Sequence, residues 1–308
     1  MHKENRIRGS LVGLALGDAI GTTLEFKPRD SYDPIDNLVG GGPFELEPGQ
    51  WTDDTSMALC MTNSLIECKG FDPFDQMKRY ICWYREGYCS STGDCFDIGA
   101  TVETALLSFE SSGNPFSGST DPWSAGNGSI MRLAPVPIYY NNNLMDAITY
   151  SGESSKTTHR AEESVAGCQL LGSVLWHLFN GTGKNALLEQ SIQAIADLSI
   201  KLPEKITNIG QGAFHGKLRN EIRGSGYVVD SLEAALWCFY QTETYHNAVL
   251  LAANLGDDAD TTAAVCGQIA GAHYGYDSIP KEWKERLYMH EMIVRLVDQL
   301  GCSSINPD

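Results

Sequence analysis

Apolar residues recur along much of the chain at the three- and four-residue spacing of amphipathic helices. One such stripe follows Trp51 and consists of Met57, Cys60, Met61, Ser64 and Leu65. The same spacing returns over 160–179 and 230–240, and 261–273 is a variant rich in alanine and glycine. Small residues on a helix surface leave room for a close neighbour. The pattern predicts helices over all four stretches.

A first helix, near the N-terminus, has glycine at every fourth position. These residues are Gly9, Gly13, Gly17 and Gly21. Glycine inside a helix lowers its stability by about 0.5–1 kcal/mol relative to alanine. Four aligned glycines therefore indicate that something lies very close to that side of the helix, either another helix or a ligand.

Strand signals are few and short. The segments 227–229 and 136–140 are rich in Tyr, Val and Ile, but a proline weakens the second. Stretches rich in Gly, Pro, Asn and Ser indicate loops at 28–50, 111–129 and 141–156. No repeat of 20–50 residues is apparent. The sequence predicts an all-α fold with long functional loops, formed by a single domain over residues 1–308.

Composition and charge narrow the possible partners. The chain is 42% hydrophobic and 20% charged, as is typical of soluble globular proteins. Its net charge of −17 argues against nucleic acid, which requires clustered Lys and Arg. Asp18 ends the apolar run near the N-terminus, and no apolar segment reaches the roughly 20 residues that span a bilayer. The nine cysteines form no Cys-x-x-Cys pair. We expect reduced thiols, no membrane association and a cytoplasmic location.

Two short acidic segments match each other, and each directly precedes a predicted helix. They are Trp51-Thr52-Asp53-Asp54-Thr55 and Gly256-Asp257-Asp258-Ala259-Asp260-Thr261-Thr262. Asp and Thr at such positions often only cap the helix. Adjacent carboxylates repel each other, however, unless a cation lies between them. Oxygen ligands without His or Cys suit hard cations such as Mg²⁺, Mn²⁺ or Ca²⁺, so the pair of segments predicts a metal site.

With three further segments, these sequences resemble the ADP-ribosylglycohydrolase family, which includes the dinitrogenase reductase-activating glycohydrolases. The matching motifs are Gly17-Asp18-Ala19-Ile20-Gly21 leading to Glu25, Trp51-Thr52-Asp53-Asp54-Thr55-Ser56-Met57, Asp97-Ile98-Gly99, Gly126-Asn127-Gly128-Ser129-Ile130-Met131-Arg132 and Asp258-Ala259-Asp260-Thr261. They occur in the family order and span residues 9–273. Each motif is weak by itself, whereas five in order are specific.

The resemblance implies a compact orthogonal bundle of helices around two divalent cations, Mg²⁺ or Mn²⁺. Carried over position by position, the metal ligands are Thr52, Asp53, Asp54, Asp258, Asp260 and Thr261. The resemblance gives Glu25 a direct role in positioning or deprotonating water, and gives Asp97 a supporting role at the metals. A surface carboxylate at Glu25 and a helix cap at Asp97 are the alternatives. The family often has Gly-Gly-Asp where this chain has Gly256-Asp257-Asp258, and we expect the additional Asp257 to face solvent.

Substrate contacts are expected at six further residues, Gly99, Asn127, Gly128, Ser129, His159 and Tyr227. The loop from Gly126 to Ser129 has the composition of a phosphate-binding nest, although Gly-x-Gly is more often only a turn. The resemblance places the diphosphate of ADP-ribose there, with His159 beside the ribose and diphosphate and Tyr227 near the adenosine. A solvated or capping histidine is the alternative for His159.

The function implied is metal-dependent hydrolysis of the glycosidic bond between ADP-ribose and a modified protein or small molecule, with ADP-ribosyl-arginine as the leading substrate. Serine-linked and small-molecule conjugates remain alternatives. A protein of the same fold without activity, which binds ADP-ribose or an ADP-ribosyltransferase, is another. An ADP-ribosyltransferase counterpart is an expected partner, and nucleic acid and membranes are not.

Overall fold

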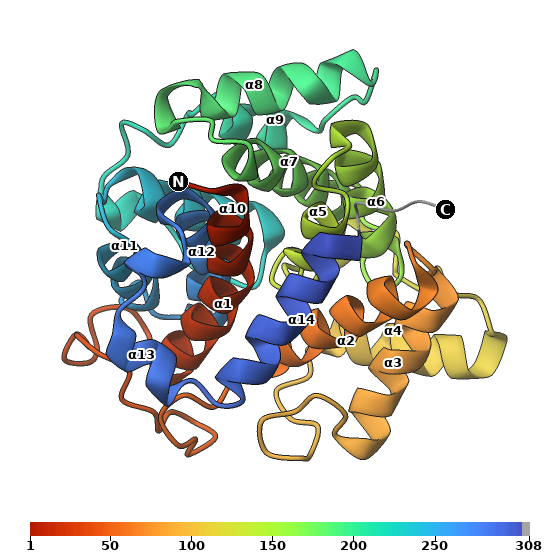
Figure 1. The fold of residues 1–308 in the computed structure, drawn as a ribbon, viewed down its shortest axis with the longest axis horizontal. Coiled ribbons are helices and arrows are strands. Elements are labelled where there is room, and N and C mark those ends of the chain that lie inside the picture. The colour runs from red at the N-terminus through yellow and green to blue at the C-terminus, as the bar shows by residue number, and fades with distance from the viewer. Residues whose placement is uncertain (304–308) are drawn as a thin grey trace.

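The computed structural model describes residues 1–303, and their regular structure is helical (Figure 1). The α-helices are α1 (Lys3–Gly21), α2 (Asp53–Cys68), α3 (Pro73–Glu86), α4 (Ala100–Ser112), α5 (Pro135–Tyr139), α6 (Leu144–Lys156), α7 (Glu162–Phe179), α8 (Lys184–Asp197), α9 (Glu204–Gly210), α10 (Val228–Tyr240), α11 (Tyr245–Ala253), α12 (Ala259–Tyr274), α13 (Lys281–Arg286) and α14 (His290–Ser303). Four 3₁₀ turns accompany them: η1 (Thr22–Leu24), η2 (Pro122–Ser124), η3 (Arg219–Glu221) and η4 (Tyr276–Ser278). Within 1–303, β-structure is limited to isolated bridges. The predicted all-α class is confirmed.

Helices α1 and α12 lie against each other in antiparallel directions near the centre of the molecule (Figure 1). A Cβ added at Gly9 would lie 2.2 Å from the carbonyl oxygen of Gly271, and one added at Gly17 would lie 2.2 Å from that of Ala263. Any side chain at these positions would therefore push the two backbones apart. The partner that the glycine stripe predicted is a helix, and the alanine-rich stretch 261–273 provides it.

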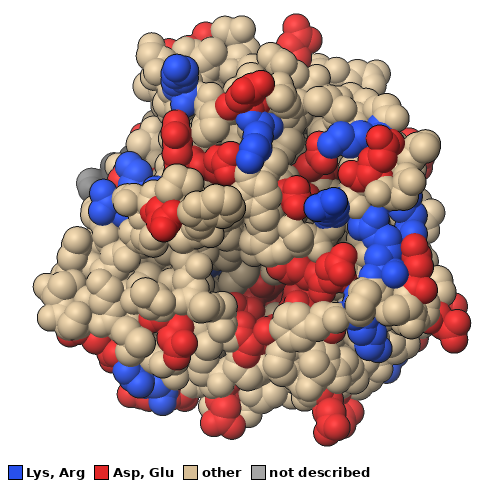
Figure 2. All heavy atoms as spheres, turned by 180° about the vertical axis from the view of Figure 1, so that it is seen from behind, with Lys and Arg blue, Asp and Glu red and all other residues tan. Residues whose placement is uncertain are grey.

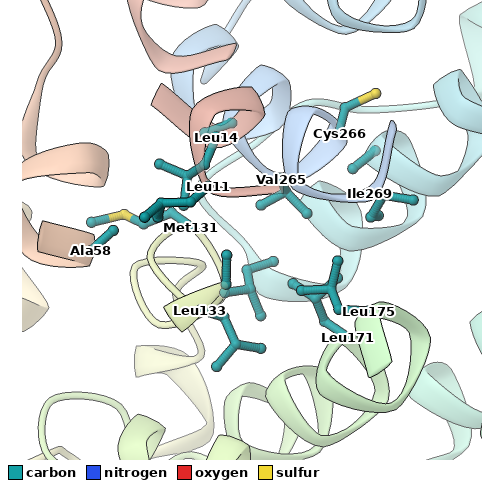
Figure 3. Packing of buried hydrophobic residues seen from close by; sticks show 14 of the residues in the cluster. Leu11, Leu14, Ala58, Met131, Leu133, Leu171, Leu175, Val265, Cys266 and Ile269 are labelled. Atoms are coloured by element: carbon teal, nitrogen blue, oxygen red, sulfur yellow. The ribbon is translucent and has the colours of Figure 1, made fainter. Parts of the chain in front are cut away.

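The buried core surrounds this helix pair. Leu11 and Leu14 of α1 and Val265 and Ile269 of α12 point into one apolar cluster, which α7 closes with Leu171 and Leu175 (Figure 3). The stripe of α2 is also buried, as its spacing predicted. Because the first and last thirds of the chain share this core, residues far apart in the sequence are held rigidly together.

One predicted loop is wrong. Residues 144–156 form helix α6, where the composition of 141–156 indicated a loop. The Asn143 side chain accepts the Asp146 backbone N–H and so caps the helix. Its buried side carries small polar residues, among them Ser151, whose hydroxyl donates to the Ala147 carbonyl and packs against Gly172 of α7. A serine whose hydroxyl bonds to a carbonyl of its own helix can be buried in a tight contact between helices. Amino-acid composition alone does not reveal this hydrogen bond.

Both weak strand signals fall in helical or capping positions. Residues 135–139 form the short helix α5, and Tyr227 is the residue that precedes α10. Tyr227 forms only an isolated bridge with Gly126. The stretches 28–50 and 111–129 contain no long helix apart from the end of α4, in agreement with the loops predicted there. No helix within 1–303 is long and apolar enough to cross a membrane.

Candidate active site

A cleft of about 320 Å³ opens on the face opposite the one shown in Figure 1. Figure 2 shows a central hollow there with acidic side chains on its floor. The cleft brings together ten of the fourteen predicted site residues: Glu25, Asp53, Asp97, Gly99, Asn127, Gly128, His159, Asp258, Asp260 and Thr261. The other four, Thr52, Asp54, Ser129 and Tyr227, do not line it directly.

The two acidic segments meet because helices α2 and α12 begin at the same place. The Thr52 hydroxyl lies 3.4 Å from Asp260 Oδ2, and the Thr261 hydroxyl lies 3.3 Å from Asp54 Oδ1. Each segment thus reaches the other across more than 200 residues of sequence. All six predicted metal ligands therefore lie in or directly behind one wall of the cleft.

The first turns of these helices are capped from elsewhere in the chain. The Asp18 carboxylate accepts the backbone N–H groups of Thr52 and Thr55 at 2.9 and 3.0 Å. Glu25 Oε2 accepts those of Ala259 and Asp260 at 2.8 and 3.3 Å. Neither Thr52 nor Asp258, the residues at the N-cap positions, caps its helix with its side chain. Simple N-capping therefore does not explain why these aspartates are clustered.

Burial and mutual repulsion disfavour the ionised forms of the carboxylates in the cleft. Burial raises the pKa of Asp97 to about 11, with added repulsion from Asp53 and Asp260, and burial with repulsion from Asp258 raises the pKa of Asp260 to about 7. The pKa of Asp54 is also raised by burial and neighbouring acids. Glu25, Asp258 and Asp260 place oxygens within 4.8 Å of one another, close enough to hold a metal ion. A cation would supply the missing counter-charge.

The loop from Gly126 to Ser129 forms a second wall of the cleft. Asn127 Nδ2 donates to Asp258 Oδ2 at 3.0 Å, which ties this loop to the start of α12. Ser129 is buried, and its hydroxyl accepts a hydrogen bond from Ser155. The Ser129 side chain is therefore turned away from the cleft, so a contact with a ligand would come from its backbone.

His159 lies between α6 and α7 rather than at the start of a helix, and only 2% of it is exposed. A Cβ at Gly126 would lie 3.1 Å from its Nε2, and a Cβ at Gly128 would lie 2.8 Å from its Cε1. The two glycines thus leave room for the imidazole at the cleft wall. Burial lowers the pKa of His159 to about 3, which keeps the ring neutral.

Tyr227 lies beyond the cleft. Its hydroxyl contacts Glu163 and accepts a hydrogen bond from Lys205 Nζ at 2.7 Å. The ring also lies beneath the Lys205 ammonium, 5.0 Å away. Tyr227 is half-buried, is joined to the Gly126 loop by its bridge and directly follows Gly226, which lines the cleft.

Comparison with known proteins decides the family. The family model described as ADP-ribosylglycohydrolase matches residues 1–305. The chain is 47% identical to an ADP-ribosylarginine hydrolase of Serratia proteamaculans, over 96% of this chain and 79% of that one. It is 30% identical to the ADP-ribosyl-[dinitrogen reductase] glycohydrolase of Rhodospirillum rubrum, over 96% of each. The chain belongs to the ADP-ribosylglycohydrolase family.

A solved structure described as an ADP-ribosylglycohydrolase-related protein complex has the same fold, with a TM-score of 0.86 and 36% identity over 98% of this chain and 99% of that one. The resemblance read from five motifs is therefore confirmed. So is the prediction of a hydrolase that acts on glycosidic linkages of ADP-ribose.

In this ADP-ribosylglycohydrolase, Asp257 is exposed, as expected, and has a left-handed backbone with φ 59°. Its carbonyl accepts the Phe26 N–H, and its own N–H donates to the Lys27 carbonyl. The residue therefore joins two loops through its backbone while its carboxylate faces solvent.

Sequence reasoning missed two residues of this site. The sequence motifs assign no role to Asp18, although an acid that follows an apolar helical run is a signal of a buried polar contact. Phe26 lines the cleft beside Glu25 and is 65% exposed. Its ring packs edge-on against Phe44, which packs against Phe96, with centroids 6.3 and 5.3 Å apart. An exposed aromatic ring beside acidic side chains can bind a planar cation that stacks on its face.

Proposed function

We propose that this enzyme hydrolyses the N-glycosidic bond between ADP-ribose and an arginine side chain. The observation that carries the proposal is the pairing of two unlike walls. Carboxylates from α2 and α12 form one wall, and a glycine loop with a neutral histidine forms the other. The acidic wall suits the cations and the ribose, whereas the glycine loop suits an anion.

Two relatives support the choice of arginine. Proteins of Serratia proteamaculans and Pseudomonas putida, 47% and 44% identical to this chain, are described as ADP-ribosylarginine hydrolases. The cleft also suits this linkage, because Phe26 presents an aromatic face beside acidic residues. A guanidinium is planar and cationic, and it can stack on an aromatic ring. A serine linkage offers no such group.

The residues present fit divalent cations. Asp54 Oδ2 is buried without a hydrogen-bond partner, and the surrounding donors are carboxylate and hydroxyl oxygens. An all-oxygen set of this kind suits Mg²⁺ or Mn²⁺. The residues that would hold two such ions are Thr52, Asp53, Asp54, Asp258, Asp260 and Thr261. When bound, the ions supply positive charge that offsets the carboxylates and orients the ribose hydroxyls.

The protein's own side chains and loops would carry out proton transfer and substrate binding. Glu25 positions the attacking water and accepts its proton as the oxygen adds to the anomeric carbon. The bond from this carbon to the arginine nitrogen breaks through a state of oxocarbenium character, and the departing guanidine takes up the proton that Glu25 removed from the water. Asp97 holds the water and metal-side groups in place. Gly99, Asn127, Gly128, Ser129 and His159 bind the diphosphate side, and Tyr227 contacts the adenosine.

The substrate defines the counterpart of this enzyme. ADP-ribosyl-arginine must be made by an ADP-ribosyltransferase, so the enzyme reverses that modification on a protein or small molecule. All nine cysteines are free thiols, which agrees with work in a reducing compartment such as the cytoplasm.

The decisive experiment incubates the enzyme with arginine- and serine-ADP-ribosylated peptides, in Mg²⁺, in Mn²⁺ and in EDTA. Mass spectrometry should show loss of ADP-ribose from the arginine peptide in either metal and none in EDTA. Release from the serine peptide alone would refute the arginine specificity. Binding of both peptides without release would identify the chain as a non-catalytic member of the family.

A further inference from the structure

Arg132 is buried beneath the Gly126–Ser129 loop and has 0% exposed surface. Its guanidinium donates to the Gly128 carbonyl and to the Thr158 hydroxyl, the latter at 2.6 Å, and its Nη1 lies 3.9 Å from the Met57 sulfur. None of these three partners is an acid. The guanidinium also lies 4.9 Å from the ring of Tyr80. A buried cation without a carboxylate is costly, so its location under this loop calls for an explanation.

The Thr158 hydroxyl determines which way its hydrogen bonds run. It contacts Arg132 Nη2 and, at 2.9 Å, His159 Nδ1. A hydroxyl has one proton to donate, and an arginine can only donate. The Thr158 oxygen therefore accepts from Arg132. Within residues 1–303 the other hydrogen-bond partner of this buried hydroxyl is His159 Nδ1. Its proton therefore goes to Nδ1, because a hydroxyl that accepted from both groups would leave its own proton buried without an acceptor. A neutral imidazole whose Nδ1 accepts a hydrogen bond must have its proton on Nε2.

The orientation of His159 directs the Nε2–H group of this tautomer toward the loop assigned to the diphosphate. Its ring lines the cleft, and its Nε2 side lies against Gly126, in the loop assigned to the diphosphate. In the other tautomer, the Nε2 lone pair would face an anionic ligand and repel it. Burial and the nearby Arg132 charge both lower the pKa of His159, to about 3, so the ring does not gain a second proton at neutral pH.

We propose that Arg132 and Thr158 are positioning residues that hold His159 as a neutral Nε2–H donor for a diphosphate oxygen of ADP-ribose. The ligand in this statement rests on the proposed function, whereas the tautomer rests on the hydrogen bonds alone. Arg132 also holds the Gly128 carbonyl, so one buried cation orients both the loop and the histidine beside it. The guanidinium thus acts on the ligand only through Gly128, Thr158 and His159.

The tautomer is measured directly by NMR of the full chain labelled with ¹⁵N-histidine, assigned with His159→Gln. We expect the His159 proton on Nε2 in the wild type and in Thr158→Ser, which keeps the hydroxyl. Thr158→Val keeps the shape but removes the hydroxyl, so a shift toward the Nδ1–H form is expected. A wild-type spectrum with the proton on Nδ1 overturns the proposal without any variant.

Calorimetric titration with ADP-ribose tests the consequence of the tautomer. Affinity should fall about tenfold or more in Thr158→Val, the scale of one hydrogen bond to a charged group, and by less than about threefold in Thr158→Ser. Circular dichroism establishes that both variants are folded. If Thr158→Val is unfolded, the Thr158→Ser and wild-type spectra still decide the tautomer. Equal affinity in a folded Thr158→Val with an altered tautomer overturns the proposal.

Failure of the proposed function would look different. In that case the wild type would show the Nε2–H tautomer and bind ADP-ribose, yet release none from the arginine peptide. Hydrolysis also separates positioning from general damage to the structure. Thr158→Val should raise KM for ADP-ribosyl-arginine about as much as it weakens ADP-ribose binding, with a smaller change in kcat. An equal loss in kcat with unchanged KM would contradict the positioning role.

Discussion

Asp18 accepts two hydrogen bonds from Thr52, one from the backbone N–H and one from the hydroxyl, each 2.9 Å long. It accepts two more from the backbone and hydroxyl of Thr55, at 3.0 and 2.6 Å. A carboxylate in the last turn of α1 therefore forms the cap of α2. The position of Asp53 and Asp54 in the cleft depends on an acid that does not line it.

Replacing Asp18 with alanine should damage both stability and the site. The change leaves four buried donors without their acceptor, so unfolding free energy should fall by about 2 kcal/mol or more in denaturant titrations. Metal affinity and hydrolysis should fall with it. Asp72→Ala is the matched control, since Asp72 caps α3 by accepting two N–H groups at a half-buried position away from the cleft. It should cost about 1 kcal/mol and leave hydrolysis intact. Equal activity in both variants would contradict this role of Asp18.

Removing one acidic metal ligand should abolish most of the stabilisation of the folded protein by metal. Asp260→Asn keeps the shape but removes a charge, so it should abolish hydrolysis and leave the metal-free protein as stable as the wild type or more stable. Metal at a hundred times its Kd should stabilise the wild type by about 2.7 kcal/mol and this variant much less. Asp257→Asn is the control, because Asp257 is exposed three residues away. Thermal unfolding at pH 8 with Mg²⁺ or EDTA measures both, and an equal metal effect in the two variants would refute the metal site.

Glu25 combines capping with its proposed chemical role, and two substitutions separate these. Glu25→Gln keeps an oxygen for the Ala259 and Asp260 N–H groups but cannot take a proton. We expect kcat to fall about 10²–10⁴-fold with little loss of stability. Glu25→Ala should lose kcat equally and also about 0.5–2 kcal/mol of unfolding free energy. Near-normal kcat in Glu25→Gln would reduce Glu25 to a structural residue.

Gly128 should be needed both for the position of the His159 ring and for binding of the ligand. A Cβ there would lie 2.8 Å from His159 Cε1, so alanine must displace the imidazole, and the larger valine displaces it further. Gly128→Ala and Gly128→Val should weaken ADP-ribose binding in that order, measured by calorimetry. Gly183→Ala, where nothing lies within 4 Å of the added Cβ, is the control. Unchanged affinity in a folded Gly128→Val would contradict the phosphate-binding loop.

His159 should make the protein less stable in acid. Its pKa is lowered to about 3 in the folded protein, against an ordinary value of 6.5. Between these values the unfolded chain binds a proton that the folded protein does not, so stability is lost as the pH falls below 6.5. At pH 5 this amounts to about 2 kcal/mol, from roughly 1.4 kcal/mol per pH unit. His159→Asn, compared with the wild type in EDTA at pH 7 and pH 5, should lack that loss. Parallel losses in both proteins would contradict the lowered pKa.

The helices that could be predicted are those whose apolar residues follow a regular stripe, such as α2 with Met57, Cys60 and Leu65. Helix α6 was not predicted because its buried side consists largely of serine. In the sequence, a serine that bonds to its own helix cannot be told from a loop residue. Composition reports polarity, but it does not report whether a polar group is satisfied locally.

The candidate site shows the same division. The acidic segments and the glycine loop were predicted, since each carries a local pattern that one kind of ligand requires. Asp18, Phe26 and the contact from Arg132 to Thr158 were not predicted, because their roles depend on what lies beside them in three dimensions. Asp18 and Thr52 are 34 residues apart, and no local spacing connects them.

The close crossing of α1 and α12 also bears on how the protein is made. Gly9 and Gly271 meet backbone to backbone, yet the ribosome adds Gly271 more than 250 residues after Gly9. Domains begin to fold during synthesis, but α1 has no partner for its glycine side until α12 has left the exit tunnel. Until then Asp53 and Asp54 also lack the second acidic segment. A nascent chain truncated before α12 should therefore expose an unpaired helix and be a target for chaperones, and catalytic capacity should arise only after α12 has emerged.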